Sequence, residues 1–288
     1  MNTTIPNKSF ITADGGLNVC LDATEVSWFD FLWYSRRKTS DKGGWNSKSY
    51  WRERGVSRIT GNASVFLKDW TINSLLQDGA FLPIPRDAKF MFDRSLSERR
   101  SNLEVSLGKH KCAIENATEN ELNYALYNRG FGKFKHLEWV ELLGFEIPLA
   151  QERDGQLKVD LFGISSTGDA IEIIELKKAN GTDTPLMALT EAICYGLQTL
   201  RCKDSLMREA NLGEPVFKKI NLTILAPPAY WTQWDSKSGI NAALQNINKD
   251  LQVIIEQVNA AIGDQKIDSK LVLTLRALEP VEPTPSAS

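Results

Sequence analysis

The middle of the chain carries two strand-like runs joined by a turn-like segment. Residues 157–164 and 170–177 are rich in Val, Ile and Leu, and the SSTGD segment between them has the composition of a turn. A symmetric loop centred on residues 167–168 pairs Asp160 with Glu175 across an antiparallel hairpin, with their Cβ atoms about 5 Å apart. A loop one residue longer or shorter would move the side chains of one strand to the other face of the sheet. The sequence thus predicts a hairpin that brings two carboxylates together.

Helical and strand-like segments surround this hairpin. Thr118 before an acidic first turn, with Gly130 as a stop, predicts a helix of about three turns. Apolar spacing predicts the remaining elements: a short helix at 136–143, a strand at 145–150, helices at 185–201 and 240–262, and strands at 221–226 and 270–276. The order helix, three antiparallel strands, helix, strand, helix, strand predicts an α/β fold with a mixed central sheet flanked by helices.

Charged residues interrupt the second run of the hairpin. Glu175 and Lys177 lie two positions apart in IEIIELKKA, so a strand projects both from one face. A Glu-x-Lys triplet by itself is more often the wet face of a strand. Asp160 favours a functional site over a wet strand face, because like charges directly opposite each other destabilise a sheet and such a pairing needs a reason. A divalent cation such as Mg²⁺ would give the pairing a reason, since it takes one or two carboxylates and fills its shell with water and phosphate oxygens.

The run KVDLFGISSTGDAIEIIELKKA resembles the signature of the PD-(D/E)XK nuclease superfamily, in which an Asp on one strand is followed by a hairpin and Glu-x-Lys. Val159 stands where the family name has Pro, a departure common in this superfamily. The element order from residue 118 is also similar to the αβββαβ core of restriction-endonuclease-like proteins, and the resemblance covers about residues 115–226. It implies hydrolysis of phosphodiester bonds with one or two Mg²⁺ or Mn²⁺ ions.

The resemblance also implies roles for named residues. Asp160 and Glu175 would hold the metal, with the backbone carbonyl of Leu176 as a further ligand. Lys177 would orient the attacking water or stabilise the negative charge that develops on the phosphate oxygens. A lysine beside two carboxylates should remain charged, which suits electrostatic stabilisation better than general-base work.

Many members of the superfamily carry a further Glu on the helix before the first strand, directed at the metal. Four glutamates are candidates here: Glu119, Glu121, Glu138 and Glu141. Glu119 is preferred, because it shares a helical face with Leu122 and Leu126 and so faces the sheet. The alternative is that Glu119 is an acidic first-turn residue favoured by the helix dipole.

Some members also have a Gln-xxx-Tyr pair on the helix after Glu-x-Lys. Glu191 and Tyr195 have this spacing in TEAICYG, with Glu in place of Gln. An ordinary amphipathic helix explains the pair at least as well.

The first part of the chain has a different composition. Residues 36–58 contain eight Lys or Arg against two acidic residues, with Trp and Tyr interleaved. Cations that meet phosphates and rings that stack on unpaired bases suit a nucleic-acid surface. The alternative is a solvated basic loop whose tryptophans are buried in a small core. The candidate nucleic-acid contacts are Arg36, Arg37, Lys38, Arg52 and Arg54.

Composition and motifs argue against several other classes of protein. The four cysteines lack CxxC spacing and only two histidines are present, so the sequence predicts reduced cysteines in a cytoplasmic protein rather than a zinc site. Neither an apolar run of roughly 18 residues nor a basic segment followed by an apolar stretch occurs, so no membrane partner or secretory signal is expected. Walker, GxGxxG, HExxH and GxSxG motifs are missing from the sequence.

The sequence divides into three predicted parts: an N-terminal aromatic and basic domain at 1–112, a nuclease-like core at 113–278, and a disordered tail with three prolines at 279–288. The leading hypothesis is a Mg²⁺-dependent endonuclease whose partner is DNA rather than RNA, with the oligomeric state, a homodimer included, left open. The rival is a non-catalytic nucleic-acid-binding or interaction module that keeps the fold, against which all three motif residues argue. A third alternative is an unrelated α/β domain with a merely wet Glu-x-Lys strand.

Overall fold

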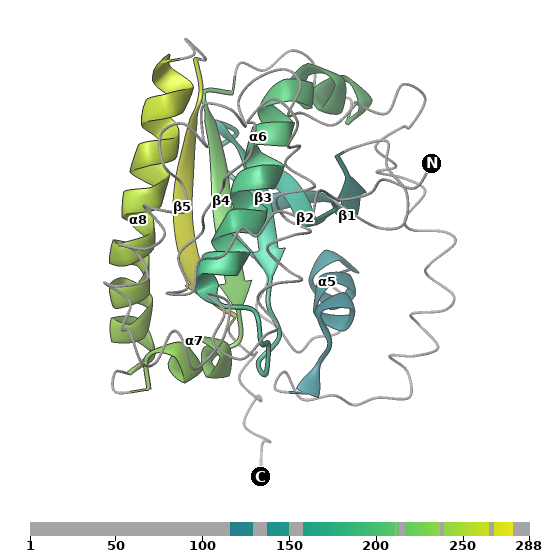
Figure 1. The fold of residues 1–288 in the computed structure, drawn as a ribbon. Coiled ribbons are helices and arrows are strands. Elements are labelled where there is room, and N and C mark those ends of the chain that lie inside the picture. Colours follow the sequence, from purple (N-terminus) through teal and green to yellow (C-terminus); the bar gives the residue numbers. More distant parts are fainter. Residues whose placement is uncertain are drawn as a thin grey trace, which may run out of the picture.

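A five-stranded mixed sheet forms the centre of the α/β fold (Figure 1). Its strands lie in sequence order: β1 (Val140–Pro148), β2 (Lys158–Ser165), β3 (Ala170–Leu176), β4 (Lys219–Ala226) and β5 (Lys270–Ala277). The first three strands are antiparallel, as predicted, and β4 and β5 run parallel to β3. All seven residues of β3 are buried, which makes this central strand the most enclosed position for a functional group.

The computed structural model describes residues 116–128, 137–149, 158–210, 212, 217–236, 239–264 and 268–278. The predicted N-terminal domain at 1–112 and the predicted tail at 279–288 lie outside these residues. The candidate nucleic-acid contacts therefore lie outside them as well: Arg36, Arg37, Lys38, Arg52 and Arg54.

The β2–β3 hairpin has the register that a symmetric loop predicts. Leu161 pairs with Ile174 and Ile164 with Ile171, and the two pairs between them follow the same register. Gly168, in the loop, has a φ of 71°, a left-handed conformation that glycine adopts without steric penalty. The loop is closed by a backbone hydrogen bond from the Gly168 N–H to the Ser165 carbonyl, 2.8 Å long.

Helices cover both faces of the sheet. The long helices α6 (Pro185–Glu209) and α8 (Ile240–Asp264) pack on one face, where their buried residues share a core with Ile171 and Ile173. Helix α5 (Glu119–Asn128) packs on the opposite face against β1, β2 and β3, in a second core that contains Ile174 and Leu176. Strand β3 thus contributes alternate residues to two cores.

Two predictions of secondary structure differ from the fold. Residues 136–143 were expected to form a helix, but β1 begins at Val140 and pairs with β2 as far as Pro148. Cross-strand pairing here outweighs a local pattern that fits a helix. Helix α7 (Pro228–Trp234) was not expected, because Pro227 and Pro228 read only as the end of β4. Proline at the first helical position is nevertheless favourable, since its missing N–H has no partner there.

Candidate functional site

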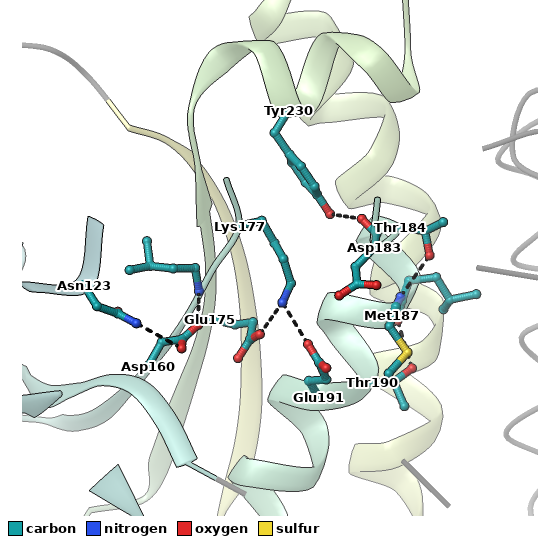
Figure 2. Close-up of polar contacts among 12 residues, drawn as sticks. Asn123, Asp160, Glu175, Lys177, Asp183, Thr184, Met187, Thr190, Glu191 and Tyr230 are labelled. Atoms are coloured by element: carbon teal, nitrogen blue, oxygen red, sulfur yellow. Dashed lines mark hydrogen bonds and ion pairs between the residues drawn. The ribbon is translucent and has the colours of Figure 1, made fainter. Parts of the chain in front are cut away.

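Lys177 lies between two carboxylates at the end of β3. Its Nζ donates to Glu175 Oε1 at 2.5 Å and to Glu191 Oε2 of α6 at 2.9 Å (Figure 2). Lys177 is 2% exposed, Glu175 3% and Glu191 0%. A buried charge without a partner costs several kcal/mol, so this complete burial requires the double ion pair.

The strand alternation explains how β3 supplies this group. Glu175 follows Ile171 and Ile173 on the face that α6 covers. Lys177 comes directly after the strand and continues the same alternation, while α6 brings Glu191 to it from the next layer. Glu175 and Lys177 therefore lie on one face, as predicted, but that face is packed rather than wet.

Asp160 lies near the start of β2, at the end of the hairpin that is away from the loop. Its Oδ2 accepts the Leu176 backbone N–H at 2.8 Å, and its Oδ1 accepts Asn123 Nδ2 of α5 at 3.1 Å. The hairpin register, continued by one residue, sets Asp160 opposite Glu175, as the symmetric loop predicts. The Asp160 carboxylate remains within electrostatic range of Glu175 and Lys177.

Leu176 connects the two halves of the site through its backbone. Its side chain is buried in the α5-side core, and its N–H is directed toward Asp160 on β2. The N–H and C=O groups of one strand residue face the same neighbouring strand in an antiparallel pair. The Leu176 carbonyl therefore also faces β2, the strand that carries Asp160. The sequence predicts this carbonyl as a metal ligand.

The carboxylates of the site outnumber its cation. Burial raises the pKa of Asp160 to about 6, although Lys177 opposes the shift. Burial also raises the pKa of Glu175 well above its usual range, Lys177 opposes this shift, and the charges of Asp160 and Glu191 add to it. For Lys177 burial acts to lower the pKa, but Glu175 and Glu191 outweigh it and raise the pKa well above the ordinary value. Lys177 is therefore charged at neutral pH, and the three carboxylates are short of positive partners.

Two oxygens at the site lack hydrogen-bond donors among the residues that the structure describes. They are Glu175 Oε2 and Asn123 Oδ1, and both are buried. Buried polar atoms normally have a hydrogen-bond partner, and a bound cation would supply a partner for Glu175 Oε2. Glu175 Oε2 lies on the carboxylate that the sequence predicts as a metal ligand.

The donor set fits a magnesium-type cation only in part. Within the described ranges, no three His, Cys, Asp or Glu side chains are grouped so as to hold a metal by themselves. Mg²⁺ does not require such a group, because it is commonly held by one or two carboxylates together with waters and substrate phosphates. Asp160 and Glu175, on the neighbouring strands β2 and β3, are two such carboxylates.

The four glutamates considered for the helix position have different surroundings. Glu119 is half-buried and its charge acts on Asp160 and Lys177, which places it near the site. Glu121 forms a capping box with Thr118, in which the Thr118 N–H donates to Glu121 Oε2 at 2.8 Å. Glu138 and Glu141 are exposed on the approach to β1 and on β1 itself. Of the four, Glu119 is the one with electrostatic access to the site.

Sequence reasoning missed Asn123 and left Glu191 undecided. Asn123 is 1% exposed and lies four residues after Glu119, so it shares the helical face that was expected to meet the sheet. Glu191 matched the Gln-xxx-Tyr spacing, and the structure brings it to Lys177. Tyr195, the other member of that pair, is buried in the α6-side core.

Helix α7 fixes the loop between Lys177 and α6. Tyr230 Oη donates to the Asp183 carbonyl at 2.9 Å, and Gln233 Nε2 donates to the Gly181 carbonyl at 2.9 Å (Figure 2 shows the former). At the end of this loop, Thr184 Oγ1 caps α6 by accepting the Met187 N–H at 3.2 Å. These bonds hold the loop that connects Lys177 to α6, the helix on which Glu191 lies.

A polar groove lies on the other face of the sheet, over β3, β4 and β5. It has a volume of about 430 Å³ and is lined by Trp139, Glu172, Asn221 and Arg276, among others. Asn221 Nδ2 donates to Glu172 Oε1, and Arg276 stacks on Trp139 at 4.4 Å from the ring centroid. Burial raises the pKa of Glu172 to about 7, the largest influence on this group. Glu172 is thus a second buried glutamate on β3, directed away from Lys177.

Comparisons with known proteins do not assign the chain to a family. Neither the protein-family models, nor the curated proteins, nor the solved structures contain a match to it. Among the helices of the described part, none has the length and apolarity needed to cross a membrane. The site geometry and the fold therefore carry the argument about function: an α/β protein with a mixed five-stranded sheet and a buried carboxylate–lysine centre at the end of its middle strand.

Proposed function

We propose that the chain is a metal-dependent nuclease of the PD-(D/E)XK kind that hydrolyses phosphodiester bonds in DNA. The observation that carries the proposal is the buried Lys177 held by Glu175 and Glu191, with a third carboxylate, Asp160, close by. Two buried acids and a half-buried one around a single lysine destabilise a resting fold, and a function at this site would explain them. A divalent cation recruited by the excess carboxylates supplies that reason.

Asp160 and Glu175 are the residues that would hold the cation, with the Leu176 carbonyl as a further candidate. Glu175 Oε2 is available, since among the described residues it has no hydrogen-bond donor. Asn123 and the Leu176 N–H fix the orientation of the Asp160 carboxylate. A bound Mg²⁺ or Mn²⁺ would supply a Lewis acid for the phosphate and a water of lowered pKa.

Lys177 would stabilise the charge that develops on the phosphate oxygens. It is charged, and its two carboxylate partners hold the ammonium in one place, so little reorganisation is needed during the reaction. Its raised pKa makes it unsuitable as a general base at neutral pH. Glu119, half-buried on α5, would add negative charge near the cation.

The fold supports the proposal at a coarser level. Helix α5, the antiparallel strands β1 to β3, helix α6 and strand β4 follow one another in the order expected for a restriction-endonuclease-like core. The proposal includes the N-terminal basic segment, with Arg36, Arg37, Lys38, Arg52 and Arg54, as the surface that binds nucleic acid. The rival, a binding module without turnover, would have the same fold.

Incubation of the purified full-length protein with circular single-stranded and duplex DNA tests the proposal. Each substrate is offered with Mg²⁺, Mn²⁺ or EDTA, and an RNA of similar length tests the preference for DNA. We expect cleavage with Mg²⁺ or Mn²⁺ and none with EDTA. Binding without metal-dependent cleavage of any substrate would favour the rival.

A further inference from the structure

In the proposed reaction Glu191 contacts neither the cation nor the phosphate and takes part only through the ammonium of Lys177. It is fully buried on α6, and Lys177 lies between it and Glu175 (Figure 2). Beside the buried Glu175, a second buried acid makes the centre less stable by itself, so the charge of Glu191 calls for an explanation.

Glu175 faces two cationic partners in the proposed reaction. Its Oε1 is bonded to Lys177 and its Oε2 is available to a divalent cation. When the cation draws charge from Glu175, the bond between Glu175 and Lys177 weakens, and the cation repels the ammonium. With no second anion, Lys177 would be left buried without a counter-charge.

Glu191 cannot readily take the alternative role of a shared metal ligand. It approaches from α6, whereas Asp160 is bonded to α5 and to the β3 backbone. Glu191 and Glu175 both accept hydrogen bonds from Lys177, and within the described residues no three acidic side chains are grouped around one point. Glu191 therefore acts through Lys177.

We propose that Glu191 is a positioning residue that retains the Lys177 ammonium in the centre when Glu175 takes up a divalent cation. The proposal rests on the proposed function, because it assumes that a cation binds at Asp160 and Glu175. The cation and the Lys177 ammonium carry like charges. Glu175 alone would hold both of them less well than Glu175 and Glu191 do together.

Calcium binding tests the effect of Glu191 on cation affinity without cleavage. The Kd for Ca²⁺ is measured by calorimetry for the parent, for Glu191→Gln, and for Glu172→Gln as the matched control. Glu172 is also a buried glutamate of β3, but it faces the polar groove on the other face of the sheet. We expect Glu191→Gln to weaken Ca²⁺ binding by about 10- to 100-fold, as the loss of an outer-shell partner does, and Glu172→Gln to leave it unchanged.

A second measurement follows Lys177 directly. The NMR signal of a buried, hydrogen-bonded lysine ammonium is visible in ¹⁵N spectra and is identified by its loss in Lys177→Met. We expect this signal to persist in the parent with and without Ca²⁺. In Glu191→Met, which removes both charge and acceptor but fills the space, it should be present without Ca²⁺ and be lost at saturating Ca²⁺.

The outcomes separate the two proposals. If the parent binds Ca²⁺ and Glu191→Gln binds it as tightly, the role of Glu191 is refuted while the nuclease proposal stands. Persistence of the Lys177 signal in Ca²⁺-saturated Glu191→Met has the same meaning. If the parent binds no divalent cation, the proposed function and this inference both fail. Circular dichroism of each variant establishes that it is folded, and either variant alone is sufficient for the comparison.

Discussion

At the scale of single residues, two adjacent lysines have opposite surroundings. Lys177 is buried in a double ion pair, whereas Lys178 is exposed. This contrast provides a matched pair of substitutions, since each removes one lysine charge from the same segment. The proposed function gives a role in the chemistry to Lys177 and none to Lys178.

Lys177→Met should lower the cleavage rate by about 10²–10³, the usual loss when one well-placed electrostatic group is removed. Asp160 and Glu175 remain, so cation binding should be retained. Lys178→Met should cleave at the parental rate. Single-turnover cleavage and Ca²⁺ calorimetry measure the two effects, and equal rates for both variants would remove Lys177 from the mechanism.

Asp160→Asn tests the metal ligand and the pH dependence of stability together. The raised pKa of Asp160 means that its contribution to folding is fully present below about pH 4 and is lost as the pH rises through about 6. The substituted amide has no such loss, and a rotated Asn123 amide can accept a hydrogen bond from it through the otherwise unpartnered Oδ1. In EDTA, the free energy of unfolding of the variant, relative to that of the parent, should therefore rise by on the order of 1–3 kcal/mol as the pH increases from about 5 to about 8.

Urea unfolding at both pH values measures this gain, and Ca²⁺ calorimetry should show weaker binding by the same variant. A stability difference that does not change with pH would mean that the Asp160 carboxylate titrates normally in the folded protein. Equal Ca²⁺ affinity would exclude it as a ligand.

At the scale of elements, the hairpin and the presence of the last two strands were predictable, whereas the helical residues that meet the site were less so. The turn residues and the two-residue alternation of β2 and β3 specify the register locally, so the pairing of Leu161 with Ile174 followed from sequence. Asn123 and Glu191 did not follow, because the helical residue that meets the site depends on how α5 and α6 pack on the sheet. The start of strand β1 was missed because cross-strand pairing outweighs a local pattern that fits a helix. The short helix α7 was missed because its prolines were taken only as the end of β4, although proline suits the first helical position.

Helix α6 carries Glu191, and its start is fixed by the Thr184 cap. Thr184→Ala removes the hydroxyl that accepts the Met187 N–H and should lower the free energy of unfolding by about 1 kcal/mol. Thr184→Ser keeps the hydroxyl and serves as the control, which should lie closer to the parent in urea unfolding. If the serine variant is as unstable as the alanine variant, the stabilisation comes from the methyl group and not from the cap.

At the scale of the whole molecule, the proposed division of labour puts substrate binding in the N-terminal segment and chemistry in the sheet. Replacing Arg36, Arg37, Arg52 and Arg54 with Ala should weaken DNA binding and flatten its dependence on salt, because fewer counterions are released. A control removes four lysines of the sheet domain instead: Lys203, Lys218, Lys249 and Lys270. Binding measured from low to moderate salt should change in the first variant and much less in the second.

The site also lies where the two hydrophobic cores meet. Asp160 is tied through Asn123 to α5, and Glu175 is tied through Lys177 and Glu191 to α6, with the sheet between them. A cation bound by both carboxylates would therefore link the layer of α5 to the layer of α6. Its binding free energy would stabilise the protein against separation of these layers. If the cation links the layers in this way, adding divalent cation should slow proteolysis of both α5 and α6.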